Sequence, residues 1–401
     1  MRNTQKKNLP ELRFPGFEGE WEEKQFADFT KINQGLQIAI NERKTEYSPE
    51  LYFYITNEFL RPNSQTKYFI ENPPQSVIAN KEDILMTRTG NTGKVVTNVF
   101  GAFHNNFFKI KFDKNLYDRL FLVEVLNSSK IQNKILSLAG SSTIPDLNHS
   151  DFYSISSSYP LLREQQKIGK FFSKLDRQIE LEEQKLELLK QQKKGYMQKI
   201  FSQELRFKDE NGNDYPEWEK KKLKEIACVY TGNTPSKKEN IYWNKGEYVW
   251  VTPTDINNSK NIYESEHKLT QEGYKKARQL PENTLLVTCI ASIGKNAILR
   301  KQGSCNQQIN AVVPFENINI DYLYYISDSL STFMKSIAGK TATQIVNKNT
   351  FENLKIYLAS FEEQKKIADL ISSLEELIEK QASKLIKMKS RKQGMLQIMF
   401  I

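Results

Sequence analysis

The feature that most constrains the fold is an amphipathic segment that occurs twice, 199 residues apart. Residues 162–180 read LREQQKIGKFFSKLDRQIE, and residues 361–379 read FEEQKKIADLISSLEELIE. From Ile168 and Ile367 onward, the spacing holds without a gap almost to the end of the chain. A register kept over this length indicates an internal duplication, so the two halves of the chain should build the same unit.

Apolar residues in both copies recur at alternating steps of four and three, which is the a/d pattern of a coiled coil. The predicted coiled-coil interface consists of Ile168, Phe172, Leu175, Ile179, Leu186 and Leu189 in the first copy and of Ile367, Ile371, Leu374, Ile378, Leu385 and Met388 in the second. Both copies interrupt the pattern with polar residues, at Glu182 and Lys193 and at Gln381 and Lys392. Polar residues at such positions lower stability but specify register and partner. We expect the two helices to pair with each other, the alternative being two independent surface helices.

The rest of each half is also repeated. The motif ELRF at 11–14 recurs at 204–207, and DILMTRTGNTGK at 83–94 corresponds to NTLLVTCIASIGK at 283–295. The runs YFYIT and YVWVT are rich in aromatic and β-branched residues, as strands are. Helical patterns follow in both halves. The sequence therefore predicts two mixed α/β modules, each followed by a long helix.

The predicted domains are a first module at 1–160, a helix at 161–203, a second module at 204–359 and a helix at 360–401. If the helices form an antiparallel coiled coil, a pseudo-twofold axis relates the two globular modules. Helices of roughly 35 residues are about 50 Å long. Two modules on such a spacer match the symmetry of duplex DNA with separated half-sites.

The composition favours a polyanionic partner. Lys and Arg number 58 against 48 Asp and Glu, which gives a net charge of +10 and raises affinity for nucleic acid. The sequence shows neither a signal peptide nor a run of roughly 20 apolar residues, so we expect a cytoplasmic protein with no membrane partner. Cys228, Cys289 and Cys305 are odd in number and widely spaced, which fits buried thiols in a reducing compartment.

The order of module, helix, module and helix, with QKKGYMQKIFSQELRF leading into DYPEWEKKKL, resembles the specificity (S) subunit of type I restriction-modification enzymes over essentially the whole chain. The resemblance implies that each module is a target recognition domain reading one half of a bipartite asymmetric DNA site. The coiled coil would set the gap and dock methyltransferase (modification) subunits, two of them being expected.

The resemblance also implies a chain that is not itself an enzyme and holds no cofactor of its own. S-adenosylmethionine would be bound by the methyltransferase subunits, and ATP and Mg by restriction subunits that translocate and cut through the complex. The partners implied are double-stranded DNA, the methyltransferase subunits and, through the complex, the restriction subunits. DNA methylation and restriction are then properties of the assembly.

The candidate DNA-binding residues follow from the chemistry of base and phosphate contacts, in which Arg reads guanine, Asn and Gln read adenine, and Lys, Ser, Thr and Tyr bind phosphates. Both modules place a glycine turn with a basic tip between two strand-like runs; an ordinary solvated hairpin is the alternative. The candidates are Gln34, Arg43, Lys44, Arg88, Thr89, Asn91, Lys94, Asn105 and Asn106 in the first module and Lys237, Lys238, Tyr242, Ser292, Lys295, Asn306, Gln307 and Gln308 in the second. The two sets differ in side chain, so the two half-sites should differ in sequence.

Two alternatives of other classes remain: a coiled-coil protein–protein adaptor and a solitary adenine methyltransferase. The second would use the stretch Asn72-Pro73-Pro74-Gln75, which is similar to the NPP-aromatic motif of adenine methyltransferases. Gln75 cannot stack on a base, however, and no glycine-rich turn for S-adenosylmethionine follows a strand upstream. Nor do the scattered histidines His104, His149 and His267 suggest a metal site or a catalytic triad.

Overall fold

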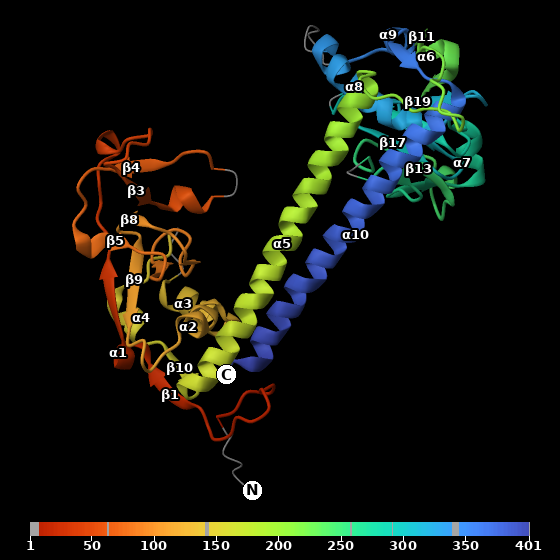
Figure 1. Cartoon of the computed structure of the whole chain (residues 1–401). Helices are drawn as coiled ribbons and strands as arrows, with labels where there is room; N and C mark the ends of the chain where they lie inside the picture. The colour runs from red at the N-terminus through yellow and green to blue at the C-terminus, as the bar shows by residue number, and fades with distance from the viewer. Residues whose placement is uncertain are drawn as a thin grey trace, which may run out of the picture. The chain divides into compact units, whose positions relative to one another are not determined.

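The structure is a computed structural model and describes residues 8–61, 64–140, 144–256, 259–290, 292–338 and 345–400. The chain forms two compact units (Figure 1). Unit 1 comprises residues 1–185 and 382–401, and unit 2 comprises residues 186–381. Both are mixed α/β, as the sequence predicts. Within the described residues, no helix combines the length and the apolar character needed to cross a membrane.

Unit 1 is built on short strands that form three small sheets, with the orders β1-β10, β2-β9-β6-β7 and β4-β3-β8-β5. Its strands are β1 (Glu22–Gln25), β2 (Thr30–Gln34), β3 (Tyr52–Ile55), β4 (Tyr68–Ile70), β5 (Ile78–Ala79), β6 (Ile84–Thr87), β7 (Val95–Val96), β8 (Gly101–Phe103), β9 (Phe107–Phe112) and β10 (Ser156–Tyr159). Its helices are α1 (Phe26–Phe29), α2 (Arg119–Asn127), α3 (Ser129–Leu138) and α4 (His149–Tyr153), with 3-10 turns η1 (Ile40–Glu42), η2 (Asn57–Leu60) and η3 (Gln75–Val77).

Unit 2 repeats this plan, with the sheet orders β11-β20, β12-β19-β16-β17-β14 and β15-β13-β18. Its strands are β11 (Glu219–Lys222), β12 (Ala227–Thr231), β13 (Tyr248–Val251), β14 (Asn261–Ile262), β15 (His267–Leu269), β16 (Thr284–Thr288), β17 (Asn296–Leu299), β18 (Gly303–Cys305), β19 (Ile309–Pro314) and β20 (Lys355–Leu358). Its helices are α6 (Leu223–Ile226), α7 (Gln271–Lys276), α8 (Ile320–Ala338) and α9 (Lys348–Glu352), with the 3-10 turn η4 (Asn240–Tyr242).

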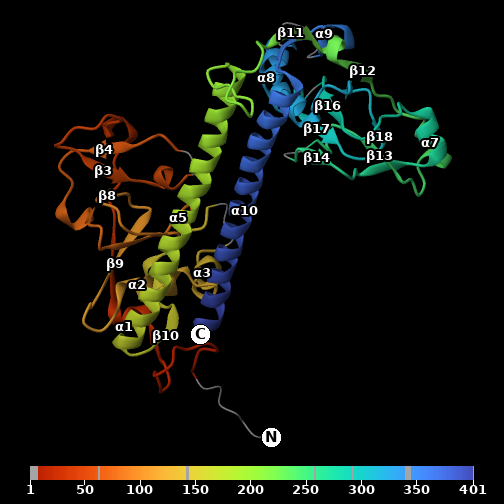
Figure 2. The ribbon, with the colours of Figure 1, turned by 45° about the vertical axis from the view of Figure 1, so that its right-hand side comes forward.

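The strand pairing confirms the duplication. In unit 1, β3 pairs in parallel with β8 and antiparallel with β4, and in unit 2 β13 pairs in the same way with β18 and β15. The helical layer differs between the units. Ser128 ends α2 and caps α3, its hydroxyl accepting a hydrogen bond from the Ile131 amide, whereas unit 2 has the single helix α8 at this place. In unit 2, α8 lies between the larger sheet and α10 (Figure 2).

The two long helices are α5 (Leu162–Phe201) and α10 (Phe361–Met399), and each contributes to both units. In unit 1, Asp176 of α5 pairs with Lys392 of α10 at 2.7 Å, and Glu183 pairs with Lys389 at 2.6 Å. Because the partner number falls as the residue number rises, the helices run antiparallel there, as predicted.

The predicted interface positions are buried or half-buried along each long helix, and those of the first turns, Ile168 and Phe172 in α5 and Ile367 and Ile371 in α10, belong to the cores of the two modules. Buried positions are Ile168, Phe172, Ile179, Leu186, Ile367, Ile371, Leu374 and Leu385, and half-buried positions are Leu175, Leu189, Ile378 and Met388. The polar interruption Gln381 is also buried. Apolar burial along one stripe of each helix is what an a/d pattern requires.

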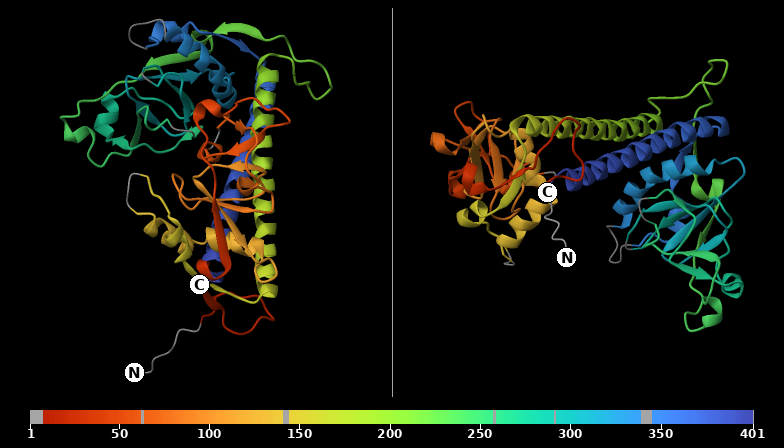
Figure 3. Two further views of the ribbon diagram at one scale, coloured as in Figure 1. Left: turned by 90° about the vertical axis from the view of Figure 1, so that its left-hand side faces the viewer. Right: turned by 90° about the horizontal axis from the view of Figure 1, so that it is seen from below.

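Each unit's hydrophobic core is completed by the C-terminal end of a long helix. In unit 1, Leu396, Met399 and Phe400 of the chain's end pack with Trp21 and Phe172. Figure 3 shows this end of α10 beside the first turns of α5. In unit 2 the end of α5 has this role, with Ile200 buried in the core and Phe201 packed against it. The core of unit 1 therefore joins residues from the two extremes of the sequence.

The polar residues of the repeated segment attach each helix to its module. Glu164 and Glu363 are buried and accept paired hydrogen bonds from Arg13 and Arg206, the arginines of the two ELRF motifs. The following residue is a buried glutamine in both copies, and it bonds the backbone of its own module. These contacts give a structural reason for the duplication of the segment: each copy carries the same attachment site for one module.

Candidate nucleic-acid interface

The two glycine turns form hairpins of the same construction. Antiparallel strands β6 and β7 flank the first turn, and β16 and β17 flank the second. In the first, the buried Thr87 hydroxyl donates to the Asn91 carbonyl and accepts from the Lys94 amide at 2.9 Å. In the second, Thr288 makes the same two bonds with the Ser292 carbonyl and, at 3.0 Å, the Lys295 amide. A buried threonine therefore fixes the shape of both loops.

One side of each loop packs on a helix. Gly93 and Gly294 have φ angles of +87° and +83°. A Cβ atom would lie 2.9 Å from the Gln132 side chain at Gly93 and 2.2 Å from the Ser331 hydroxyl at Gly294, so both positions require glycine. The adjacent lysines, Lys94 and Lys295, are exposed and have no ion-pair partner in the part of the chain that the structure describes. The loops thus present fixed backbone with one uncommitted ammonium group each.

Two other candidates near the first loop contact side chains of unit 1 itself. The Arg88 guanidinium pairs with Asp146 at 2.7 Å and lies over the Phe108 ring at 5.6 Å. The Thr89 hydroxyl donates to the same carboxylate. These contacts hold the segment before α4 against the loop. Asn91 is exposed at the tip.

A second feature that the two units share lies where two chain segments cross. Gly35 follows β2, and a Cβ atom at this position would lie 2.1 Å from the Phe103 carbonyl oxygen. Gly232 follows β12, and a Cβ atom there would lie 2.3 Å from the Cys305 carbonyl oxygen. Beside each crossing the structure gathers the predicted amide side chains. In unit 1, the Gln34 side chain donates to the Asn105 carbonyl at 3.1 Å, and Asn106 is next in the chain.

The matching cluster in unit 2 contains Asn306, Gln307 and Gln308. The Asn306 amide donates to the Gln308 side chain at 3.0 Å, and Gln307 accepts from the Thr234 hydroxyl at 2.6 Å. Gln307 is exposed, whereas Asn306 is buried. Side-chain amide groups can read the edges of adenine bases. The two units place such groups at corresponding positions, but the side chains at these positions differ between the units.

The remaining candidates divide into internal and exposed groups. Arg43 donates twice to the Ile38 carbonyl and lies over the rings of Tyr54 and Tyr68 at 5.3 and 5.4 Å, so it stabilises the module. Lys44 is exposed.

In unit 2, Lys237 and Lys238 are exposed in the segment that follows Thr234, while Tyr242 is half-buried in η4. The two lysines therefore follow closely, in the sequence, a residue that donates a hydrogen bond to Gln307 of the unit 2 amide cluster.

The sequence reasoning missed the residues across from the first glycine loop. A hollow of about 630 Å³ lies between that loop, η2 and α3. Asn57, Arg61 and Gln132 line it together with Asn91 and Lys94. No repeat marks Asn57 and Arg61 in the sequence, because the second module places Pro253 where Asn57 would correspond.

The stretch at 72–75 and the three cysteines differ in exposure: Cys289 and Cys305 are buried as expected, whereas Cys228 is exposed. Asn72 has a φ of +45°, and Asn72, Pro74 and Gln75 are exposed. Burial lowers the pKa of His104 to about 4. Burial also raises the pKa of the Cys289 and Cys305 thiols to about 12. Among the described residues, no group of three or more His, Cys, Asp or Glu side chains could hold a metal ion.

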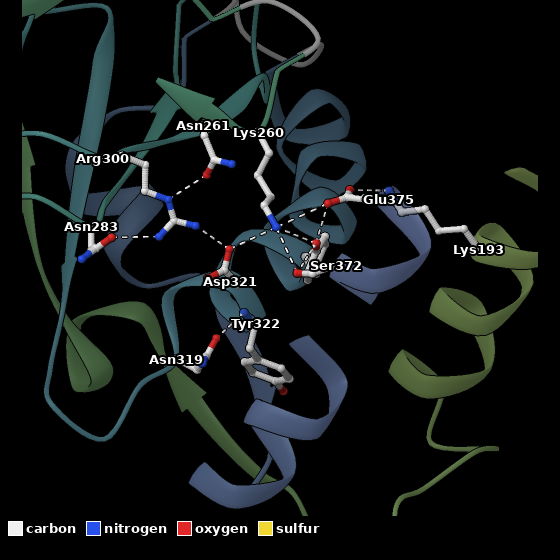
Figure 4. Close-up of polar contacts among 11 residues, drawn as sticks. Lys193, Lys260, Asn261, Asn283, Arg300, Asn319, Asp321, Tyr322, Ser372 and Glu375 are labelled. Atoms are coloured by element: carbon white, nitrogen blue, oxygen red, sulfur yellow. Dashed lines mark hydrogen bonds and ion pairs between the residues drawn. The ribbon is translucent and has the colours of Figure 1, made fainter. Parts of the chain in front are cut away.

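Each unit contains a charged cluster where the module meets the long helices. In unit 2, Lys193 of α5 pairs with Glu375 of α10 at 2.6 Å (Figure 4). Lys260 also reaches Glu375, at 3.4 Å, and pairs with Asp321 at 3.1 Å while donating to the Tyr325 hydroxyl at 2.7 Å. Lys260 precedes β14, so this cluster connects the edge of the module to α5, α8 and α10.

The corresponding cluster of unit 1 has a different balance of charge. Lys392 pairs with Asp176 at 2.7 Å and with the buried Glu124 of α2 at 3.1 Å. Two carboxylates therefore share one ammonium group. Burial and the neighbouring Asp176 raise the pKa of Glu124 to about 7, and Lys392 opposes the shift.

This arrangement predicts a pH dependence that Glu124→Gln should remove. When folding raises the pKa of a carboxyl group, the group stabilises the fold fully at a pH below its pKa in the unfolded state. This stabilisation is lost as the pH rises through the pKa in the folded state. The stability of wild-type unit 1 relative to the variant should therefore fall by about 1–3 kcal/mol between about pH 5 and pH 8. Urea unfolding followed by hydrogen exchange in unit 1 peptides would measure it. The exposed Glu180→Gln is the control, and a parallel pH profile for both variants would contradict the expectation.

Comparisons with known proteins agree with this architecture. A family model for the type I restriction modification DNA specificity domain matches residues 18–191 and again residues 215–388. The chain therefore belongs to the family of type I restriction-modification specificity proteins and carries two copies of the domain.

Individual relatives cover the chain to different extents. The MjaIX specificity subunit of Methanocaldococcus jannaschii is 34% identical over 186 residues, so the alignment spans less than half of either protein, 45% of this chain and 43% of the relative. The MjaVIII specificity subunit of the same organism is 26% identical over 401 aligned residues, 93% of this chain and 89% of the relative. The crystal structure of the S subunit from M. genitalium has a TM-score of 0.63 at 16% identity and covers 98% of this chain and 99% of that one, which shows a shared fold.

Proposed function

We propose that this chain is the DNA-reading subunit of a type I restriction-modification enzyme and that each unit reads one half of a bipartite asymmetric site. The observation that carries the proposal is the duplicated interface. Both units hold a rigid glycine hairpin with an exposed lysine and, at a crossing of two segments, a cluster of amide side chains. The two units hold these elements in equivalent positions but present different side chains, which suits the recognition of two different DNA sequences.

The proposal assigns the chemistry to partners. Methyltransferase subunits, two per chain, dock on α5 and α10 and bind S-adenosylmethionine, while restriction subunits use ATP and Mg in the same cytoplasmic complex. The long helices set the number of unspecified base pairs between the half-sites. This chain then contributes recognition and no catalysis.

Genome-wide sequencing of methylated adenine tests the proposal. We expect a split asymmetric motif that disappears when this gene is deleted beside its methyltransferase gene, and hybrids exchanging residues 1–160 should change one half of the motif. The purified complex should bind that motif with an affinity that falls steeply as salt rises, because phosphate contacts release counterions. An unchanged methylome in a strain whose methyltransferase is active would refute the proposal.

A further inference from the structure

The hollow beside the first glycine loop is a preformed recess with walls from three elements. The Asn57 side chain of η2 donates to the Thr89 carbonyl of the loop at 2.9 Å. The Gln132 side chain of α3 donates to the Gly93 carbonyl, also at 2.9 Å. These bonds fix η2 and α3 against the hairpin, which the buried Thr87 already shapes. A ligand entering the recess would therefore meet walls that are already in place.

Two cations from different walls lie on this recess. Lys94 is exposed on the loop, and Arg61 extends from the end of η2 with 69% of its side chain exposed. One guanidinium nitrogen of Arg61 pairs with Glu58 at 2.7 Å, and Glu58 also accepts from the Ser64 hydroxyl at 3.1 Å. This carboxylate orients the guanidinium group while leaving its other N–H donors available.

The lining selects the chemistry of the ligand. The guanidinium fork and the ammonium group bind phosphate oxygens, and the other polar lining groups are neutral. An extruded base is a poorer fit, because a flipped base is held by stacking on aromatic or apolar side chains. The lining, as far as the structure describes it, contains no aromatic ring and a single aliphatic side chain, Leu60.

We propose that Arg61 and Lys94 clamp one phosphate of the DNA backbone in this recess, and that Arg61 contributes to affinity without reading sequence. The inference rests on the proposed function and adds a contact that the repeat does not reveal. Since the clamp stands beside the loop tip at Asn91, it would hold the backbone next to the bases that this loop reads.

Fluorescence anisotropy with the complete complex of this chain and its methyltransferase subunits tests the clamp. The probes are a duplex carrying the methylated motif and a scrambled duplex, each titrated over a range of salt. Arg61→Gln is expected to weaken binding to both duplexes by about tenfold and to lower the salt slope by about 1, because one phosphate contact is lost. Arg61→Lys should restore most of the slope, and Arg61→Gln combined with Lys94→Gln should lower it further.

Lys275→Gln is the matched control, since Lys275 is exposed and pairs with Glu272 three residues away, as Arg61 does with Glu58. It should bind like the wild type. The clamp is refuted if Arg61→Gln leaves affinity and slope unchanged, or if it alters base preference in one half-site at constant slope. Failure of the wild-type complex to prefer its motif would instead refute the proposed function, so the two failures are distinguishable.

Discussion

Removing residues 396–401 is expected to unfold unit 1 and to leave unit 2 folded. Phe400 packs against Phe121 and Phe172, with ring centroids 5.4 and 6.0 Å apart, and Leu396 and Met399 are buried in the same core. Loss of one large core side chain costs about 2–5 kcal/mol. Three such losses approach the whole stability of a domain, about 5–15 kcal/mol. Hydrogen exchange resolved by peptide should show protection lost in unit 1 only.

Point variants separate this packing effect from a general effect of shortening the chain. Phe400→Ala should destabilise unit 1 by about 3–5 kcal/mol. Ile398→Ala is the control in the same turn, because the Ile398 side chain is exposed and should cost well under 1 kcal/mol. Equal effects of the two variants, or normal protection of unit 1 in the truncated protein, would contradict a core completed by the chain's end.

Periodicity and repetition were sufficient to predict much of this architecture. The strict spacing of 199 residues in the helices predicted two equivalent units, and the a/d positions predicted which helix faces are buried. The glycine hairpins were also predicted correctly, because a glycine turn between two strand-like runs is a short-range signal for a hairpin. Each of these inferences depends on periodicity or repetition, which a sequence displays directly.

Contacts between distant segments were beyond prediction from the sequence. Arg88 and Arg43 were selected for their base-reading chemistry, yet in the structure Asp146 and two tyrosine rings engage them. Arg61 was overlooked because the recess that it lines forms only where η2 and α3 lie beside the first glycine loop. Side-chain type indicates what a residue can bind, whereas only the folded chain shows what is already bound to it.

Glu363→Ala is expected to destabilise unit 2 by about 3–5 kcal/mol, because it leaves a guanidinium group without its buried partner. The Glu363 carboxylate is 1% exposed and accepts hydrogen bonds from Nε and Nη2 of Arg206, both at 2.9 Å. It also accepts from the Trp218 indole at 2.8 Å. Removing the carboxylate therefore breaks the attachment of α10 to the second ELRF motif. Hydrogen exchange in β11 and β20 should report the loss.

The duplication supplies a matched comparison within the same chain. Glu164 binds Arg13 in the same paired manner, at 2.8 and 2.7 Å, but the indole nitrogen of Trp21 has no hydrogen-bond partner among the described residues. Glu164→Ala should therefore destabilise unit 1 less than Glu363→Ala destabilises unit 2, by about 1–3 kcal/mol, the cost of one further unpaired donor. Equal losses, measured by the same exchange experiment, would mean that the indole bond contributes nothing and that the arginine pair alone anchors each helix.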